Sequence, residues 1–132
     1  MKVRQMRLVV EADDLEAAEA FYRDVLGLEQ SLAVDSEDGA RVVVLEAGRA
    51  TLELVNSKQR MLIDRLEVGR QVSRSIRVAF EVDDADAYTE RLEAGGAELL
   101  AGAVETPWHS LNSRLEAPAG LQITIFEQLE PE

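Results

Sequence analysis

Histidine and cysteine, two of the side-chain types that most often do chemistry, are nearly absent from this sequence. The only histidine is His109, which is either a proton carrier near neutral pH or an unused surface side chain. The chain has no cysteine, which excludes a disulfide, a thiolate metal site and a cysteine nucleophile. The paired acids Asp13 and Asp14 directly precede a helical pattern, so helix capping explains them without a glycosidase site.

Charge and composition exclude further classes of function. The sequence contains neither a Gly-rich phosphate loop nor a serine in a nucleophile elbow. The net charge of -12 argues against a nucleic-acid partner. Two explanations of this acidity are open: a soluble acidic surface, or attraction of a cationic small molecule. No apolar run is long enough to span a bilayer and residues 1–4 contain no signal-peptide core, so we expect a cytoplasmic protein without a membrane partner.

The elements that would position a site come from an internal repeat. Residues 14–28 (DLEAAEAFYRDVLGL) return in altered form as residues 84–96 (DADAYTERLEAGG), and a β-branched run precedes each copy. The offset of 70 residues predicts one unit used twice within a single domain of 132 residues. Units of this size cannot each bury a full core, so we expect them to face each other across a cleft.

Each unit is predicted to contain a strand, a helix and three further strands. The first unit takes residues 1–56 and the second takes residues 75–129. In the first helix the core-facing stripe is expected to be Leu15, Ala18, Tyr22, Val25 and Leu26, with Phe21 beside it.

Residues 57–74 are predicted to connect the two units. This segment is comparatively basic, with Lys58, Arg60, Arg65, Arg70 and Arg74. A solvated linker is one interpretation, and a short amphipathic segment lying over the cleft is the other.

Seven segments together carry a family resemblance that covers nearly the whole chain: 14–15 (DL), 21–27 (FYRDVLG), 51–55 (TLELV), 78–84 (VAFEVDD), 95–97 (GGA), 106–108 (TPW) and 118–120 (PAG). On these segments the sequence resembles the vicinal oxygen chelate superfamily, which includes glyoxalase I, extradiol dioxygenases and bleomycin- and fosfomycin-resistance proteins. The resemblance implies an α+β fold of two βαβββ units whose cupped mixed β-sheets form a cleft. It also implies a homodimer, with the units paired within one chain or swapped between chains.

The resemblance also implies where a metal would be held. Counting back from Asp14 and Asp84, and along the last strand of each unit, the four ligand positions fall on Arg7, Glu53, Arg77 and Thr124. An arginine has no lone pair to give, so Arg7 and Arg77 cannot bind a cation. Glu53 alone would bind a metal weakly, because such sites need several convergent donors. We therefore expect no metal and no other cofactor, with a divalent metal as the alternative.

The two arginines are expected to point toward Glu53 from opposite sides of the cleft. One interpretation is a structural ion-pair network that satisfies a buried Glu53. The other is a binding site in which an arginine also holds an anionic or carbonyl-bearing ligand. A register shift of one residue would instead turn Arg7 to the other face of its sheet.

Three further residues are candidates for the cleft. In related resistance proteins an aromatic side chain near the position of Trp108 lines the pocket and stacks on planar ligand groups. Packing of Trp108 in a core or at a dimer contact is the alternative. Asn112 and Thr124 are expected to offer neutral hydrogen bonds from neighbouring strands, and His109 lies beside Trp108.

Three functions follow from the resemblance. The favoured one is a metal-free small-molecule-binding protein, similar to bleomycin-resistance proteins, with its ligand in the cleft or at the dimer interface. The second is a metal-dependent glyoxalase-like lyase or isomerase, or a dioxygenase. Such chemistry needs a Lewis acid and a base, and Glu53 is the only candidate for a catalytic residue. The third is a non-catalytic interaction subunit whose cleft is filled by the arginine–glutamate network.

Overall fold

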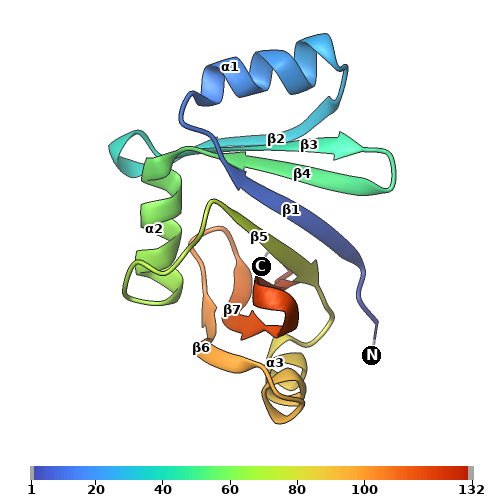
Figure 1. The fold of residues 1–132 in the computed structure, drawn as a ribbon, viewed down its shortest axis with the longest axis vertical. Coiled ribbons are helices and arrows are strands. Elements are labelled where there is room, and N and C mark those ends of the chain that lie inside the picture. Colours follow the sequence, from blue (N-terminus) through green and yellow to red (C-terminus); the bar gives the residue numbers. More distant parts are fainter. Residues whose placement is uncertain (1, 131–132) are drawn as a thin grey trace.

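The computed structural model describes residues 2–130, and its strands form one curled eight-stranded sheet (Figure 1). The strand order is β2-β3-β4-β1-β5-β8-β7-β6. The strands span Gln5–Glu11 (β1), Glu29–Asp35 (β2), Arg41–Ala47 (β3), Ala50–Val55 (β4), Ile76–Glu81 (β5), Glu98–Glu105 (β6), Ser110–Ala117 (β7) and Leu121–Gln128 (β8). The predicted α+β fold with two βαβββ units is confirmed.

The two halves of the sheet repeat one topology. In the first half β1 pairs in parallel with β4, and in the second half β5 pairs in parallel with β8. The antiparallel pairing of β1 with β5 joins the halves. The two units of the repeat therefore pair within one chain in this structure.

Helices α1 (Leu15–Glu19) and α3 (Ala85–Ala94) cover the outer face of the sheet, one on each half (Figure 1). Asp14 caps α1 as predicted, accepting from the Ala17 amide at 3.0 Å, and Asp84 caps α3 in the same way, accepting from the Ala87 amide at 3.0 Å. Under α1 lies a core of Leu15, Val43, Leu45 and Leu54, and under α3 a core of Val82, Ala85, Leu115, Ile123 and Ile125.

The apolar stripe predicted for the first helix is wrong at its end. After Glu19 the chain continues as a π-helix over Ala20–Val25, which ends with a hydrogen bond from the Leu26 amide to the Phe21 carbonyl. A π-helix has more residues per turn than an α-helix, so side chains after Glu19 rotate away from the expected stripe. Phe21, Val25 and Leu26 are consequently 56%, 76% and 60% exposed.

The connecting segment is not a solvated linker. Ser57–Glu67 form a helix, α2, whose start is capped by Asn56 accepting from the Gln59 amide at 2.8 Å. This helix contacts β3 and β4 of the first half and β6 and β7 of the second (Figure 1). The interpretation that the segment lies over the cleft is therefore the correct one. Within residues 2–130, no helix is both long and apolar enough to cross a membrane.

Candidate functional site

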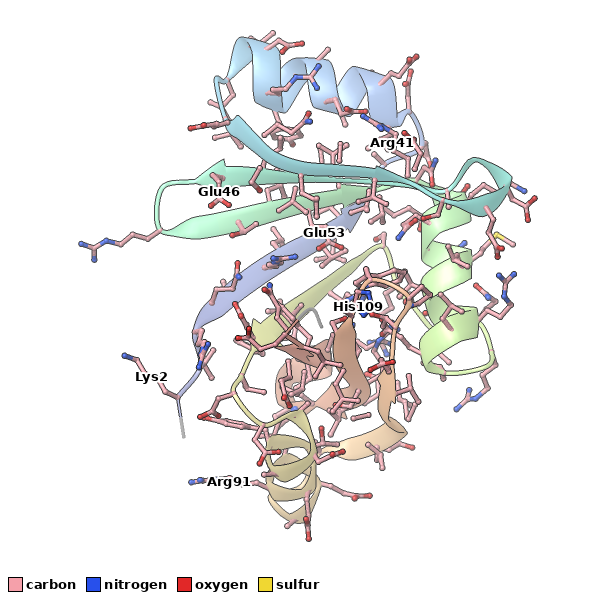
Figure 2. The ribbon with its side chains drawn as sticks, turned by 180° about the vertical axis from the view of Figure 1, so that it is seen from behind. Lys2, Arg41, Glu46, Glu53, Arg91 and His109 are labelled. Carbon is pink, nitrogen blue, oxygen red and sulfur yellow. The ribbon has the colours of Figure 1, made fainter. Side chains whose placement is uncertain are left out.

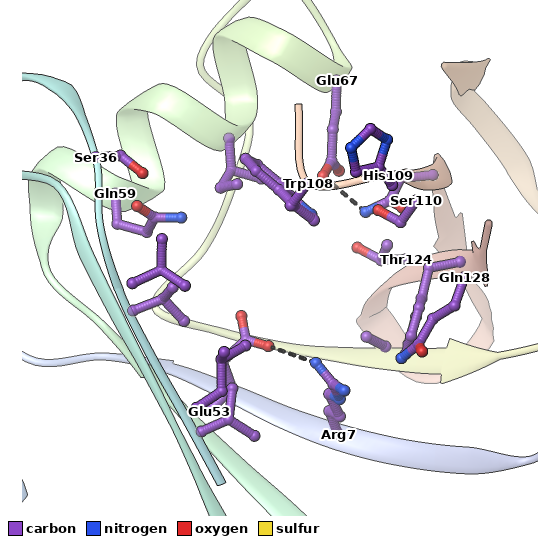
Figure 3. A pocket seen from close by; sticks show the side chains of 18 of the residues that line it. Arg7, Ser36, Glu53, Gln59, Glu67, Trp108, His109, Ser110, Thr124 and Gln128 are labelled. Atoms are coloured by element: carbon purple, nitrogen blue, oxygen red, sulfur yellow. Dashed lines mark hydrogen bonds and ion pairs between the residues drawn. The ribbon is translucent and has the colours of Figure 1, made fainter. Parts of the chain in front are cut away.

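A cavity of about 390 Å³ lies between the two halves, bounded by the inner face of the sheet and by α2 (Figure 3). Directly opposed residues of neighbouring strands share a face, and side chains alternate along each strand. Arg7 lies opposite Thr51 and Ala79, and Val9 lies opposite Glu53 and Arg77, so both arginines and Glu53 share the inner face.

The structure brings all seven candidate residues to the lining of this cavity: Arg7, Glu53, Arg77, Trp108, His109, Asn112 and Thr124. They come from β1, β4, β5, β7, β8 and the turn before β7. Glu53 on the first half and His109 on the second face the same space (Figure 2). Their role in binding a ligand stays a prediction.

Arg7 points into the cavity, as the register requires. Its Nη1 lies 3.6 Å from Glu53 Oε1 (Figure 3). Its guanidinium carbon stands 5.1 Å from the centre of the Phe126 ring, and its Nε donates to Gln5 Oε1 at 3.3 Å. Arg7 is thus held by a carboxylate, an aromatic face and an amide.

Arg77 does not pair directly with Glu53, contrary to the expectation from sequence. Its Nη1 instead donates to Thr124 Oγ1 at 2.7 Å, and no Asp or Glu oxygen of residues 2–130 lies within ion-pair distance of it. The register gives the reason, because β1 runs between β4 and β5 with Val9 between Glu53 and Arg77. Burial lowers the pKa of the Arg77 guanidinium and the charge of Arg114 lowers it further, while nearby carboxylates partly offset both effects.

A buried ionic cluster, formed by Asp64, Glu67 and Arg114, fixes α2 to the second half of the sheet. Arg114 Nη1 donates to Asp64 Oδ1 and Nη2 donates to Glu67 Oε1, both at 2.9 Å, and Arg114 is fully buried. The other oxygen of Glu67 accepts from Asn112 Nδ2 at 3.0 Å. Burial by itself would raise the pKa of Asp64, but hydrogen bonds from Ser73, Arg114 and the Val72 amide outweigh it and lower that pKa.

Sequence reasoning missed this cluster, although two signals for it are present. Asp64 and Glu67 are three residues apart and so share one face of a helix. Arg114 and Asn112 are two residues apart in β7 and so share the inner face of the sheet. The first signal depends on a helix at this position, and residues 57–74 were predicted only as a connection.

The walls and the mouth of the cavity differ in character. The walls are mainly apolar and include Val34, Val42, Val44, Ile63, Ala79 and Phe126. Trp108 and His109 lie at the mouth, opposite Glu53 and Arg7 (Figure 3). Trp108 is 41% exposed, so it does not pack in a core, and His109 is exposed in a turn with a φ of 62°.

The side chains present do not fit a divalent metal. Of the four positions that the resemblance assigns to ligands, two hold guanidinium groups, which have no lone pair, and one holds the hydroxyl of Thr124. The remaining carboxylate, Glu53, already pairs with Arg7. In the described part of the chain, no group of three or more His, Asp or Glu side chains is placed to hold a metal ion.

Comparison with known proteins adds a family and a set of similar folds. A family model described as the Glyoxalase/Bleomycin resistance protein/Dioxygenase superfamily matches residues 4–125. A hypothetical protein from Bacillus halodurans C-125 is 16% identical with a TM-score of 0.75, and the match covers 100% of this chain and 99% of that one. No protein of curated function matched.

Two solved epimerases share the fold. Methylmalonyl-CoA epimerase from Streptomyces coelicolor, in complex with 2-nitronate-propionyl-CoA, is 20% identical with a TM-score of 0.70 over 100% of both chains. Methylmalonyl-CoA epimerase from Mycobacterium tuberculosis is 22% identical with a TM-score of 0.66 over 97% of this chain and 88% of that one. At these identities the likeness establishes the fold alone.

Proposed function

The chain belongs to the glyoxalase/bleomycin resistance protein/dioxygenase superfamily, and on that basis we propose that it binds a small organic molecule in the cavity without a metal ion. The observation that supports this most strongly is the pair of guanidinium groups, Arg7 and Arg77, where a metal would otherwise be held. The cavity of about 390 Å³ is within the usual size range of small-molecule sites.

The cavity lining supports an organic ligand better than a cation. Apolar walls gain free energy by covering an apolar ligand body, while the two arginines repel a positive charge. Trp108 at the mouth presents an aromatic face on which a planar group can stack. The proposal therefore attributes the net charge of -12 to a soluble surface rather than to a cationic ligand.

A metal-dependent lyase, isomerase or dioxygenase is the second candidate, because the carboxylate of Glu53 is directed into the cavity (Figure 3). Against it stands the donor set, which offers a Lewis acid one carboxylate already paired with Arg7. An interaction subunit with a filled cleft is less well supported, because the arginine–glutamate pair leaves the cavity open.

The proposed state is a cytoplasmic homodimer. Met6, Leu8 and Ile76 lie on the outer face of β1 and β5, opposite to the cavity, and are 48%, 38% and 51% exposed. A second copy of the chain would cover these apolar side chains.

The sole tryptophan makes ligand entry measurable. We expect compounds from a library of small organic acids, amides and aromatics to change the fluorescence of Trp108 and to raise the melting temperature, with a chelator present throughout. Leu32→Arg should weaken this binding, because Leu32 lines the cavity and is 48% exposed at its edge. Val25→Arg is the matched control, since Val25 is exposed but lies outside the cavity lining. If no compound produces either signal, the proposed function is wrong.

A further inference from the structure

Arg77 is a buried cation whose hydrogen-bonding capacity is largely unused. A guanidinium group carries five N–H donors, and only the bond to Thr124 is formed within residues 2–130. The nitrogens of Arg77 are not among the fully buried polar atoms without a partner, which are Gln59 Oε1, Asn112 Oδ1 and Arg114 Nε. Arg77 and its partner Thr124 both line the cavity, which places the guanidinium group within reach of a molecule that enters it.

The other charged groups of the cavity lining already have partners. Arg7 pairs with Glu53 at 3.6 Å, and Glu67 accepts from Arg114 and from Asn112. Among the described Asp, Glu, Lys and Arg side chains of the lining, Arg77 is thus the one without a counter-ion. A buried charge is strongly stabilised by a hydrogen-bonded opposite charge, and an anionic ligand would supply it.

Thr124 adds a second donor beside the first. Its oxygen accepts from Arg77, which leaves its own hydroxyl hydrogen available to another acceptor. Figure 3 shows the Thr124 hydroxyl directed toward the cavity, on the side that faces Glu53 and Trp108. An N–H and an O–H from atoms 2.7 Å apart suit the two oxygens of one carboxylate.

The charge balance limits the ligand to a monoanion. One guanidinium without a counter-ion neutralises one negative charge, while Glu53 and Glu67 in the same lining repel a second. Arg77 matches the single charge of a carboxylate, whereas the second charge of a phosphate dianion would be left without a partner. The apolar walls, among them Val42, Val44 and Phe126, suit the uncharged remainder of the molecule.

Resting on the proposed function, we infer that the ligand is a monocarboxylic acid with an apolar or aromatic body. Arg77 and Thr124 bind its carboxylate on the cavity floor, and the body lies between the apolar walls and Trp108.

Benzoate and benzamide test this inference because they match in size and differ in charge. Trp108 fluorescence and the melting temperature are followed during titration with each, and with inorganic phosphate as a tetrahedral anion. We expect benzoate to bind at least about 10-fold more tightly than benzamide, because a hydrogen bond to a charged group outweighs a neutral one. Phosphate should give no saturable change.

Variants test whether Arg77 causes the preference for benzoate over benzamide. Arg77→Gln should weaken benzoate about 10- to 100-fold and leave benzamide nearly unchanged, and Arg77→Lys should restore part of the affinity. Thr124→Val, which removes the hydroxyl at nearly constant volume, should weaken benzoate several-fold. Arg70→Gln is the matched control, because Arg70 is exposed and lies outside the cavity lining.

The outcomes separate the inference from the proposed function. Equal affinity for benzoate and benzamide, or a benzoate preference that survives in a folded Arg77→Gln variant, overturns the inference while the cavity remains a binding site. Tighter binding of phosphate than of benzoate also overturns it. If neither these probes nor the wider library binds, the inference and the proposed function fail together.

Discussion

Replacing Arg114 with methionine is expected to lower the free energy of unfolding by about 3–5 kcal/mol. The side chain is fully buried, and its removal leaves the carboxylates of Asp64 and Glu67 without their shared cation. Two uncompensated buried charges destabilise a fold far more than the lost packing does. Urea unfolding followed by far-ultraviolet circular dichroism measures the change.

Arg74→Met provides the surface comparison for Arg114→Met. Arg74 Nη1 lies 3.0 Å from Glu116 Oε2, but its side chain is 56% exposed. Exposed ion pairs contribute little, so this variant should lose less than about 1 kcal/mol. Similar losses for the two variants would show that the buried cluster does not hold α2 against the sheet.

Replacing Arg77 with methionine is expected to raise the stability of the ligand-free protein by about 1–3 kcal/mol. Burial lowers the pKa of Arg77, so the folded state disfavours the protonated form that is present at neutral pH. An arginine stays protonated at neutral pH, and a base with a depressed pKa contributes unfavourably to stability wherever the folded state keeps its proton. Methionine, which is neutral, flexible and of similar length, removes this unfavourable contribution.

Arg7→Met should instead lower the free energy of unfolding. Arg7 has a carboxylate partner and an aromatic neighbour, so its removal leaves Glu53 unpaired on the cavity floor. Urea unfolding of both variants, in the absence of ligand, measures the change in the free energy of unfolding of each. A loss of stability in Arg77→Met as large as that in Arg7→Met would mean that Arg77 is structural. A gain in stability is the mark of a residue kept for binding at the expense of the fold.

Much of the architecture could be predicted from local signals. The aspartates that precede each helix, the β-branched runs before them and the 70-residue offset specify two units of one design. The wrong predictions concern geometry that a short stretch of sequence does not determine. Residues after Glu19 adopt a π-helix, which changes the angular spacing of Val25 and Leu26. The buried face of α2 includes Gln59, Asp64 and Glu67, so it lacks the apolar period by which a packed helix is recognised.

In the candidate site, the positions of the residues could be predicted from the sequence, but their contacts could not. The face of the sheet on which Arg7, Glu53, Arg77 and Thr124 lie follows from strand alternation. Counting residues from Asp14 and Asp84, and along the last strand of each unit, was sufficient to find these positions. The partner that each arginine selects does not follow from alternation. A guanidinium on a long side chain reaches in several directions, and the positions of Val9 and Thr124 on adjacent strands favour a bond from Arg77 to Thr124 rather than to Glu53.

Calorimetric titration with Zn²⁺, Mn²⁺ and Ni²⁺, after treatment with a chelator, tests the metal-free cavity most directly. A variant carrying Arg7→His, Arg77→His and Thr124→Glu, shown by circular dichroism to be folded, provides the positive control because it places imidazole and carboxylate donors around Glu53. We predict one equivalent of metal bound by this variant and no saturable heat from the natural sequence. Tight, stoichiometric binding by the natural sequence would contradict the proposal that arginines have taken the place of the metal.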